Sequence, residues 1–194
     1  MDKRLQEQIT FIMETDKLKR VIRRNYNADG SRLENTAEHS WQITLLALTL
    51  AEHAEESVDI CKILKMLLIH DLVEIDAGDT YLYGEGDASE KEKKEQEAAD
   101  RIFGMLPADQ GAAYLSIWKE FEAGETAESR FAKAIDRLMP ILNNFHSEGR
   151  SWKENGIHRE QVINKCKGIA EGSGKLWDYA LQIIDEAYEK VYLR

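Results

Sequence analysis

The 194-residue sequence is poor in features that interrupt helices or build sheets. It contains two prolines and no extended run of valine, isoleucine and threonine, so helices are favoured over strands. Basic charge is also scarce, because 26 Lys and Arg residues face 36 Asp and Glu residues and leave a net charge of −10. Nucleic-acid polymers and anionic membranes attract basic surfaces, and we therefore exclude both as general partners. A small anionic substrate stays possible where basic residues gather locally.

Cysteine and long apolar runs are rare as well. Cys61 and Cys166 have no metal-type spacing, and we expect both to be reduced residues of the protein core. The N-terminal segment lacks the apolar stretch of a signal peptide. The densest apolar run, residues 63–69, includes Lys65 and is too short to cross a bilayer. These absences favour a soluble cytoplasmic protein.

Apolar residues recur at helical spacing through most of the chain. We expect an all-α fold in one domain over residues 1–194, a compact bundle of roughly seven to nine helices. Its motif-bearing core would span about residues 18–144, with the C-terminal helices of 145–194 packed on it. The expected helices are a first one with Leu5, Ile9, Phe11, Ile12 and Met13 on one face, then 36–56, 57–76, 89–104, one after Pro107, 126–145, 158–171 and 175–193. Residues 25–31 and 77–87 are expected to form loops.

Ionisable residues gather at the end of the most apolar of these helices. Glu74 follows His70 by four residues and Asp71 by three, so the three side chains lie toward one side of a helix. Burying them is costly unless a cation or an ion-pair partner offsets the charge. A divalent metal would do so, although a single helical histidine is more often a hydrogen-bonded core residue. His39, early in the preceding helix, would lie near His70 if the two helices are antiparallel neighbours.

Asp136 is a fourth candidate ligand. Apolar residues flank it, and Pro140 cannot donate a hydrogen bond to its carbonyl, so we expect the helix to bend there. A surface ion pair with Arg137 or Lys133 would explain Asp136 equally well. Two histidines and two aspartates without a thiolate suit one divalent ion of Mn, Fe, Co, Zn or Mg and leave positions for water and a substrate oxygen.

A local excess of basic residues offers a site for an anionic substrate. Six basic residues lie between positions 17 and 32, against one acid: Lys17, Lys19, Arg20, Arg23, Arg24 and Arg32, with Asp29. Arg20, Arg23 and Arg24 are expected on one helical face, where guanidinium groups can bind phosphate. A solvated basic helix end is the alternative. Tyr26 is placed to stack on a base or a sugar.

The segment Glu38-His39-Ser40-Trp41, the pair His70-Asp71 with Glu74, the pair Gly78-Asp79, and Asp136 together resemble the HD-domain metal-dependent phosphohydrolases. The similarity covers about residues 18–144 and is greatest to the 5′-deoxynucleotidase branch. The resemblance implies one divalent metal ion per chain, ligated by His39, His70, Asp71 and Asp136. It further implies Glu74 as the acid/base residue acting on the attacking water, Asp79 as a second catalytic carboxylate near the leaving group, Glu38 as a support of the ligands and Arg23 as a contact to substrate. A helix cap or a surface ion pair is the alternative role for Glu38. That branch has a tryptophan close behind the arginine, where this chain has Arg24-Asn25-Tyr26. A homodimer also fits the family.

The sequence therefore predicts a metal-dependent phosphohydrolase of (deoxy)nucleoside 5′-monophosphates or similar small phosphate esters. A nucleotide phosphodiesterase or pyrophosphohydrolase is the alternative within the same class, and it would want a larger basic surface or further histidine ligands. A non-catalytic nucleotide-binding protein is the alternative from another class. Such proteins usually lack one of the metal ligands or the catalytic glutamate, and this chain has all four expected ligands and Glu74.

Overall fold

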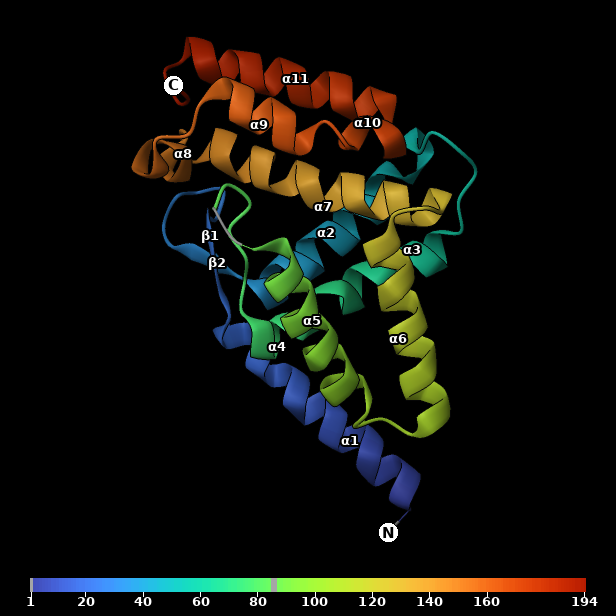
Figure 1. The fold of residues 1–194 in the computed structure, drawn as a ribbon. Helices are drawn as coiled ribbons and strands as arrows, with labels where there is room; N and C mark the ends of the chain where they lie inside the picture. Colours follow the sequence, from blue (N-terminus) through green and yellow to red (C-terminus); the bar gives the residue numbers. More distant parts are fainter. Residues whose placement is uncertain (1, 85–86) are drawn as a thin grey trace.

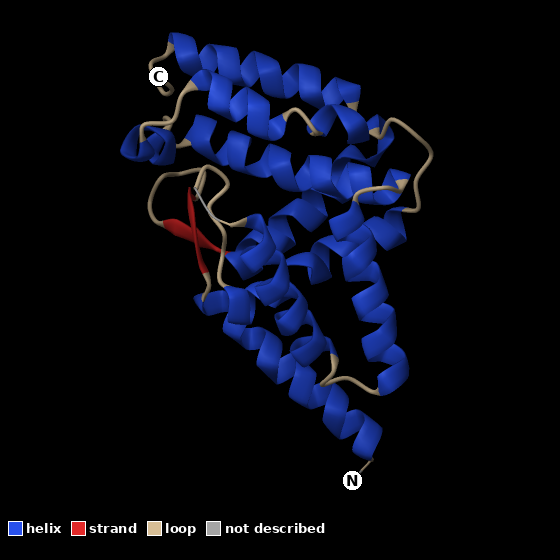
Figure 2. Ribbon diagram, in the orientation of Figure 1, coloured by secondary structure: helices blue, strands red, loops and turns tan. Residues whose placement is uncertain are grey.

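Helices dominate the computed structural model, which describes residues 2–84 and 87–194 (Figures 1 and 2). Its α-helices are α1 (Lys3–Thr15), α2 (Thr36–Leu50), α3 (Ile60–Ile69), α4 (Glu74–Ala77), α5 (Ala88–Phe103), α6 (Ala108–Ala123), α7 (Ala127–His146), α8 (Arg150–Asn155), α9 (Arg159–Cys166), α10 (Ile169–Gly172) and α11 (Gly174–Glu189). Of these eleven described segments, α4 and α10 have four residues each, so nine are longer than about one turn. The expected all-α bundle is confirmed.

A short antiparallel sheet is the one departure in fold class among the described residues. It joins β1 (Ile22–Tyr26) to β2 (Leu33–Asn35), with Ile22 opposite Asn35 and Tyr26 opposite Leu33. The backbone reverses between the strands at Gly30, which has a φ of 67° and so needs the freedom of glycine.

The strand changes the expected arrangement of the basic residues. Arg20 ends a 3₁₀ turn, whereas Arg23 and Arg24 lie in β1. Successive side chains of a strand point to opposite faces, so the prediction that these three arginines share a helical face is wrong. Pairing with β2, which begins seven residues after the end of β1, outweighs the local helical pattern.

The central element is α7. It packs against α10 and α11 on one side and against α2, α3 and α6 on the other (Figure 1). Phe131, Ile135 and Leu138 recur at helical spacing along it and are buried, as are Ile43 of α2 and Ile63 of α3. Pro140 lies within α7 without ending it. Of the later helices, α8, α10 and α11 therefore contact the element that carries Asp136, and α9 packs against α11.

The helix bounds differ from expectation where tertiary contacts intervene. The predicted helix 57–76 divides into α3, a 3₁₀ turn over His70–Val73, and α4. It ends at Gly78, which has a φ of 76°. The predicted helix 36–56 stops as an α-helix at Leu50 and continues as a 3₁₀ turn to His53. Residues 85–86 of the predicted loop 77–87 lie outside the described residues.

The predicted burial of Cys61 is wrong, and the apolar face of α1 is largely exposed. The apolar face expected for α1 points outward: Leu5, Ile9, Ile12 and Met13 are each more than half exposed, and Phe11 is the buried residue of the set. Cys61 is exposed, whereas Cys166 is buried as expected. Within the described residues, no helix combines the length and the apolar composition that spanning a membrane requires.

Candidate metal centre

Three elements bring two histidines and an aspartate together. His39 lies in the second turn of α2, His70 begins the 3₁₀ turn after α3, and Asp136 lies in the middle of α7. One ligand atom from each residue lies within 4.8 Å of the others. Asp136 Oδ1 is 2.9 Å from His39 Nε2 and 3.7 Å from His70 Nε2. The predicted approach of His39 to His70, and of both to Asp136, is therefore present in the structure.

The start of α2 explains why His39 points inward. Asn35 accepts a hydrogen bond from the backbone N–H of Glu38, and the Glu38 side chain accepts one from the backbone N–H of Asn35, which forms a capping box. The box fixes the first turn of the helix. His39 follows on the face that packs against α3 and α7, and it is fully buried.

Asp71 borders this cluster without belonging to its tightest part. Its Oδ1 lies 3.0 Å from His70 Nε2, and its Oδ2 accepts a hydrogen bond of 3.2 Å from Arg23 Nη1. Asp71 thus lies between the histidines and the arginine expected to bind phosphate.

The hydrogen bonding of His70 favours the tautomer that can bind a metal ion through Nε2. His70 Nδ1 lies 3.0 Å from the carbonyl of Leu67, so Nδ1 carries the proton and Nε2 presents a lone pair. This buried Nε2 atom has no hydrogen-bond partner within the described residues. A buried lone pair without a partner is costly, and a borderline divalent cation is a suitable acceptor of it.

The surrounding charge fits a cation as well. Among the described residues, Arg23 is the guanidinium that contacts the carboxyl groups of the site, and five of these groups are buried or partly buried: Glu34, Asp71, Glu74, Asp79 and Asp136. So many acids close together are unfavourable without further positive charge. The donor set of imidazole nitrogens and carboxylate oxygens is one that Mn, Fe, Co or Zn accepts.

The histidines and Asp136 perturb one another. In the metal-free chain, burial alone would raise the pKa of Asp136, but the hydrogen bond with His39 and the nearby His70 hold it well below its ordinary value. Burial would lower the pKa of His70, and the charges of Asp71 and Asp136 instead raise it well above the usual value. The pKa of His39 is raised too, since Asp136 and Glu34 outweigh burial and the charge of Arg23. Strong mutual perturbation of this kind is typical of functional sites.

Two further carboxyl groups stand beside the cluster. Glu74, the first residue of α4, is buried, and its Oε2 accepts a hydrogen bond of 2.9 Å from Thr36 Oγ1. Burial and the charge of Asp71 raise the pKa of Glu74 to about 9. Asp79 follows Gly78 and has an Oδ1 atom 3.5 Å from Arg23 Nη1. Burial raises the pKa of Asp79 despite that arginine.

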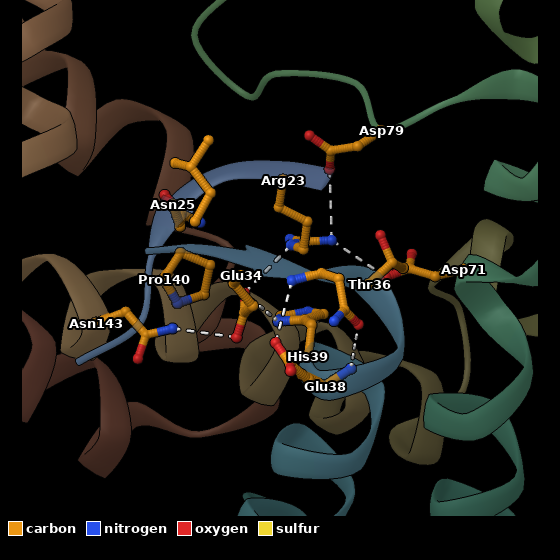
Figure 3. Close-up of polar contacts among 12 residues, drawn as sticks. Arg23, Asn25, Glu34, Thr36, Glu38, His39, Asp71, Asp79, Pro140 and Asn143 are labelled. Carbon is orange, nitrogen blue, oxygen red and sulfur yellow. Dashed lines mark hydrogen bonds and ion pairs between the residues drawn. The ribbon is translucent and has the colours of Figure 1, made fainter. Parts of the chain in front are cut away.

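Arg23 lies among three carboxyl groups (Figure 3). Its side chain is 12% exposed, and besides Asp71 and Asp79 it faces Glu34, with 3.5 Å between Arg23 Nε and Glu34 Oε2. Arg23 and Arg24 line the cavity that also contains Glu74, Asp79 and Asp136.

Other predicted substrate contacts lie elsewhere. Neither Arg20 nor Tyr26 lines this cavity. The Tyr26 hydroxyl donates to Glu154 at 3.1 Å, and the guanidinium of Arg150 covers the Tyr26 ring at 4.0 Å. The interpretation of Tyr26 as a stacking platform is therefore not supported by its contacts.

The alternative roles weighed for Asp136 and Glu38 have different outcomes. Asp136 does not form a surface ion pair, since Arg137 donates to the carbonyl of Lys165 and Lys133 to that of Glu122. Glu38, by contrast, pairs with Arg32 at 2.7 Å on the surface, in addition to capping α2. Its contacts are those of a capping and surface-pairing residue rather than of a support for the ligands.

Sequence reasoning missed two residues of the site, Glu34 and Thr36. Both are buried and both have polar contacts to the residues above. The available signal was an acid in the short segment Leu33-Glu34-Asn35 directly before the α2 cap. That segment has no helical periodicity, and its strand character depends on pairing with β1.

A helical fold whose buried centre gathers histidines, aspartates and the guanidinium of Arg23 defines a protein with a candidate centre for a metal ion and an anionic ligand. The chain belongs to the HD-domain family, whose model matches residues 15–177. Three similar proteins carry the name 5′-deoxynucleotidase HDDC2. The Homo sapiens protein is 26% identical over 69% of this chain, the Danio rerio protein 26% over 88%, and the Dictyostelium discoideum protein 27% over 82%.

The alignments cover different shares of these relatives. The chain spans 65% of the length of the human protein, slightly less than two thirds, and 88% of both the zebrafish and the Dictyostelium proteins.

Solved structures share the fold. The crystal structure of a predicted metal-dependent phosphohydrolase from Magnetospirillum magnetotacticum MS-1 is 49% identical, with a TM-score of 0.95 over 99% of this chain and 96% of that chain. A conserved hypothetical protein from Pyrococcus furiosus is 23% identical, with a TM-score of 0.61 over 93% of this chain and 99% of that one, and it shares the fold alone.

Proposed function

We propose that this protein is a metal-dependent phosphohydrolase that cleaves (deoxy)nucleoside 5′-monophosphates or similar small phosphate monoesters. The observation that carries the proposal is the buried lone pair of His70 Nε2, without a hydrogen-bond partner among the described residues and surrounded by His39, Asp136 and Asp71. The names of the HDDC2 relatives and of the Magnetospirillum structure support it.

His39, His70, Asp71 and Asp136 would hold one divalent ion. When bound, such an ion polarises a phosphoryl oxygen and acidifies water. Its identity among Mn, Fe, Co, Zn and Mg is left to experiment, although two imidazoles favour a transition metal over Mg.

The neighbouring residues account for the remaining steps. In the metal-free chain Glu74 is protonated at pH 7, and the charge of a bound divalent ion would favour its ionised form. The ionised Glu74 would accept a proton from the attacking water, and the hydroxyl of Thr36 fixes the orientation of the Glu74 carboxyl. Arg23 binds the phosphate through its guanidinium. When the bond from phosphorus to the 5′ oxygen breaks, Asp79 gives that oxygen a proton, a role that suits its raised pKa.

The test is hydrolysis by the purified protein. Nucleoside mono-, di-, tri- and cyclic phosphates are incubated with it in Mn²⁺, Co²⁺ or Mg²⁺, and released phosphate or nucleoside is measured. We expect release from 5′-monophosphates, lost on addition of a chelator. Cleavage restricted to cyclic or polyphosphorylated nucleotides would favour a phosphodiesterase or pyrophosphohydrolase, and binding without cleavage would favour a non-catalytic protein.

Metal content provides a second test. His70→Ala should greatly reduce bound metal, because each ligand is a large share of a small site. His158→Ala, a histidine exposed on the surface, is the matched control and should retain it. Equal metal content in both variants would place the metal elsewhere.

We also propose a homodimer. The exposed side of α2 carries Trp41, Leu45 and Leu48 at helical spacing, and Leu68 is exposed on α3, which packs against α2. An exposed apolar patch of this kind is typical of an association surface. Light scattering after gel filtration should give twice the chain mass, and Trp41→Lys should halve it. The single domain and the cytoplasmic location stay predictions.

A further inference from the structure

Three buried polar atoms that lack a hydrogen-bond partner within the described residues face one another. They are Arg23 Nε, Glu34 Oε2 and His39 Nδ1. Glu34 Oε2 lies 3.5 Å from Arg23 Nε and 3.4 Å from His39 Nδ1. The three residues come from β1, β2 and α2, and Figure 3 shows Glu34 between the other two side chains.

The second oxygen of Glu34 has a different partner. Oε1 accepts a hydrogen bond of 3.3 Å from Asn143 Nδ2, on the same helix as Asp136. Glu34 is 1% exposed and Asn143 is equally buried. The carboxyl group is therefore held from α7 on one side and directed at Arg23 and His39 on the other.

The contact between Glu34 and His39 bears on how His39 could bind a metal ion. His39 Nε2 faces Asp136 and the other candidate ligands, so it must present a lone pair to bind a metal, and Nδ1 must then carry the proton. A carboxylate at Nδ1 fixes that tautomer and makes the imidazole a better ligand. Glu34 is the acidic side chain at this atom, whereas Glu38 is paired with Arg32.

We propose that Glu34 is a positioning residue that serves both halves of the site, orienting His39 toward the metal ion and Arg23 toward the substrate phosphate. This inference rests on the proposed function. One carboxylate that contacts both side chains links metal binding to phosphate binding. Its replacement should therefore weaken both, although Glu34 itself touches neither the metal nor the substrate.

Glu34→Gln tests the proposal most directly, because it removes the charge and changes the shape of the side chain little. An amide keeps the shape and can still accept from Asn143, but its NH₂ group would face Arg23 Nε and the Nδ1–H of His39, which are themselves donors. The apparent Kd for Mn²⁺, measured by calorimetry on chelator-treated protein, should rise about 10–100-fold, the range found for lost supports of metal-binding histidines. KM for a nucleoside 5′-monophosphate at saturating Mn²⁺ should rise as well.

Two further variants complete the experiment. Glu38→Gln removes a charge four residues away while keeping a capping side chain, and it should leave the Kd for Mn²⁺ and the KM unchanged. Glu34→Asp keeps the charge on a shorter side chain. Its Kd for Mn²⁺ and its KM should therefore rise less than those of Glu34→Gln. If Glu34→Gln does not fold, the comparison of Glu34→Asp with the wild type takes its place, and we expect raised values of both Kd and KM.

The outcomes separate the two proposals. A wild-type protein that binds no Mn²⁺ and hydrolyses nothing would refute the proposed function. A wild-type protein that does both, with a Glu34→Gln variant of lower unfolding midpoint but unchanged Kd for Mn²⁺, would make Glu34 a merely structural residue. A change in Kd or in KM alone would remove the link between them, and each of these last results would overturn the inference.

Discussion

Replacing Glu74 by glutamine should remove catalysis and stabilise the metal-free protein. In the folded chain the pKa of Glu74 rises from its ordinary value of 4.5 to about 9, chiefly through burial and the charge of Asp71. At pH 7 the folded state therefore holds a proton that the unfolded state has released. Folding then costs about 1.4 kcal/mol for every pH unit above 4.5, or about 3 kcal/mol at pH 7. Glutamine is neutral in the folded and in the unfolded state, so its folding does not carry this free-energy cost.

The sign of the pH dependence follows directly. Between pH 4.5 and 9 the folded state binds more protons at Glu74 than the unfolded state, so this group makes stability fall as pH rises. In the presence of a chelator, the free energy of unfolding of Glu74→Gln should exceed that of the wild type by less than about 1 kcal/mol at pH 5 and by about 3 kcal/mol at pH 7. Urea unfolding at several pH values measures the difference.

Turnover should move in the opposite direction. Glu74→Gln should lose about 10²–10⁴-fold in kcat, the usual contribution of a general acid or base, while still binding Mn²⁺. Glu92→Gln, on the exposed side of α5, is the matched control and should alter neither stability nor kcat. A stability gain that does not grow with pH would refute the electrostatic argument. Loss of Mn²⁺ from Glu74→Gln would make Glu74 a ligand or a support of one.

Three other outcomes are expected. Arg23→Ala should raise KM and lower kcat/KM for phosphate monoesters about 10–100-fold, with bound metal unchanged, because one charge-assisted contact is lost; kinetics equal to the wild type would place the phosphate elsewhere. At pH 8 iodoacetamide should label Cys61, which is exposed, and spare Cys166, because burial raises the pKa of Cys166 to about 11 and leaves roughly a thousandth of it ionised; equal labelling by mass spectrometry would contradict this. Phe131→Ala should cost about 3–5 kcal/mol in urea unfolding, since Phe131 is fully buried at the centre of the core, and a loss below about 1 kcal/mol would mean that the core is elsewhere.

The spacing of residues along the chain was sufficient to predict the class of fold and part of the candidate site. Helical periodicity and the scarcity of proline determined the all-α architecture. The interval from His70 to Glu74 placed ionisable groups at the end of an apolar helix, and burial made a cation their natural partner. His39 and Asp136 were identified through a known motif order, and the packing of α2, α3 and α7 then brought them to His70.

Other features depended on contacts between segments distant in sequence. The extended conformation of residues 22–26 requires the hydrogen bonds of β2, so local pattern assigned the basic segment to a helix, and the position of Arg23 among Glu34, Asp71 and Asp79 was invisible. The outward face of α1 is a second case, because periodicity shows that a helix has an apolar side but not which side its neighbours cover.

The sequence alone thus determined which groups can do chemistry, because residue type and helical spacing are local properties. Only the tertiary structure decided which groups act together. A carboxyl such as Glu34 gains its role from two partners on other elements, and no spacing along the chain encodes the 3.4 Å between it and His39.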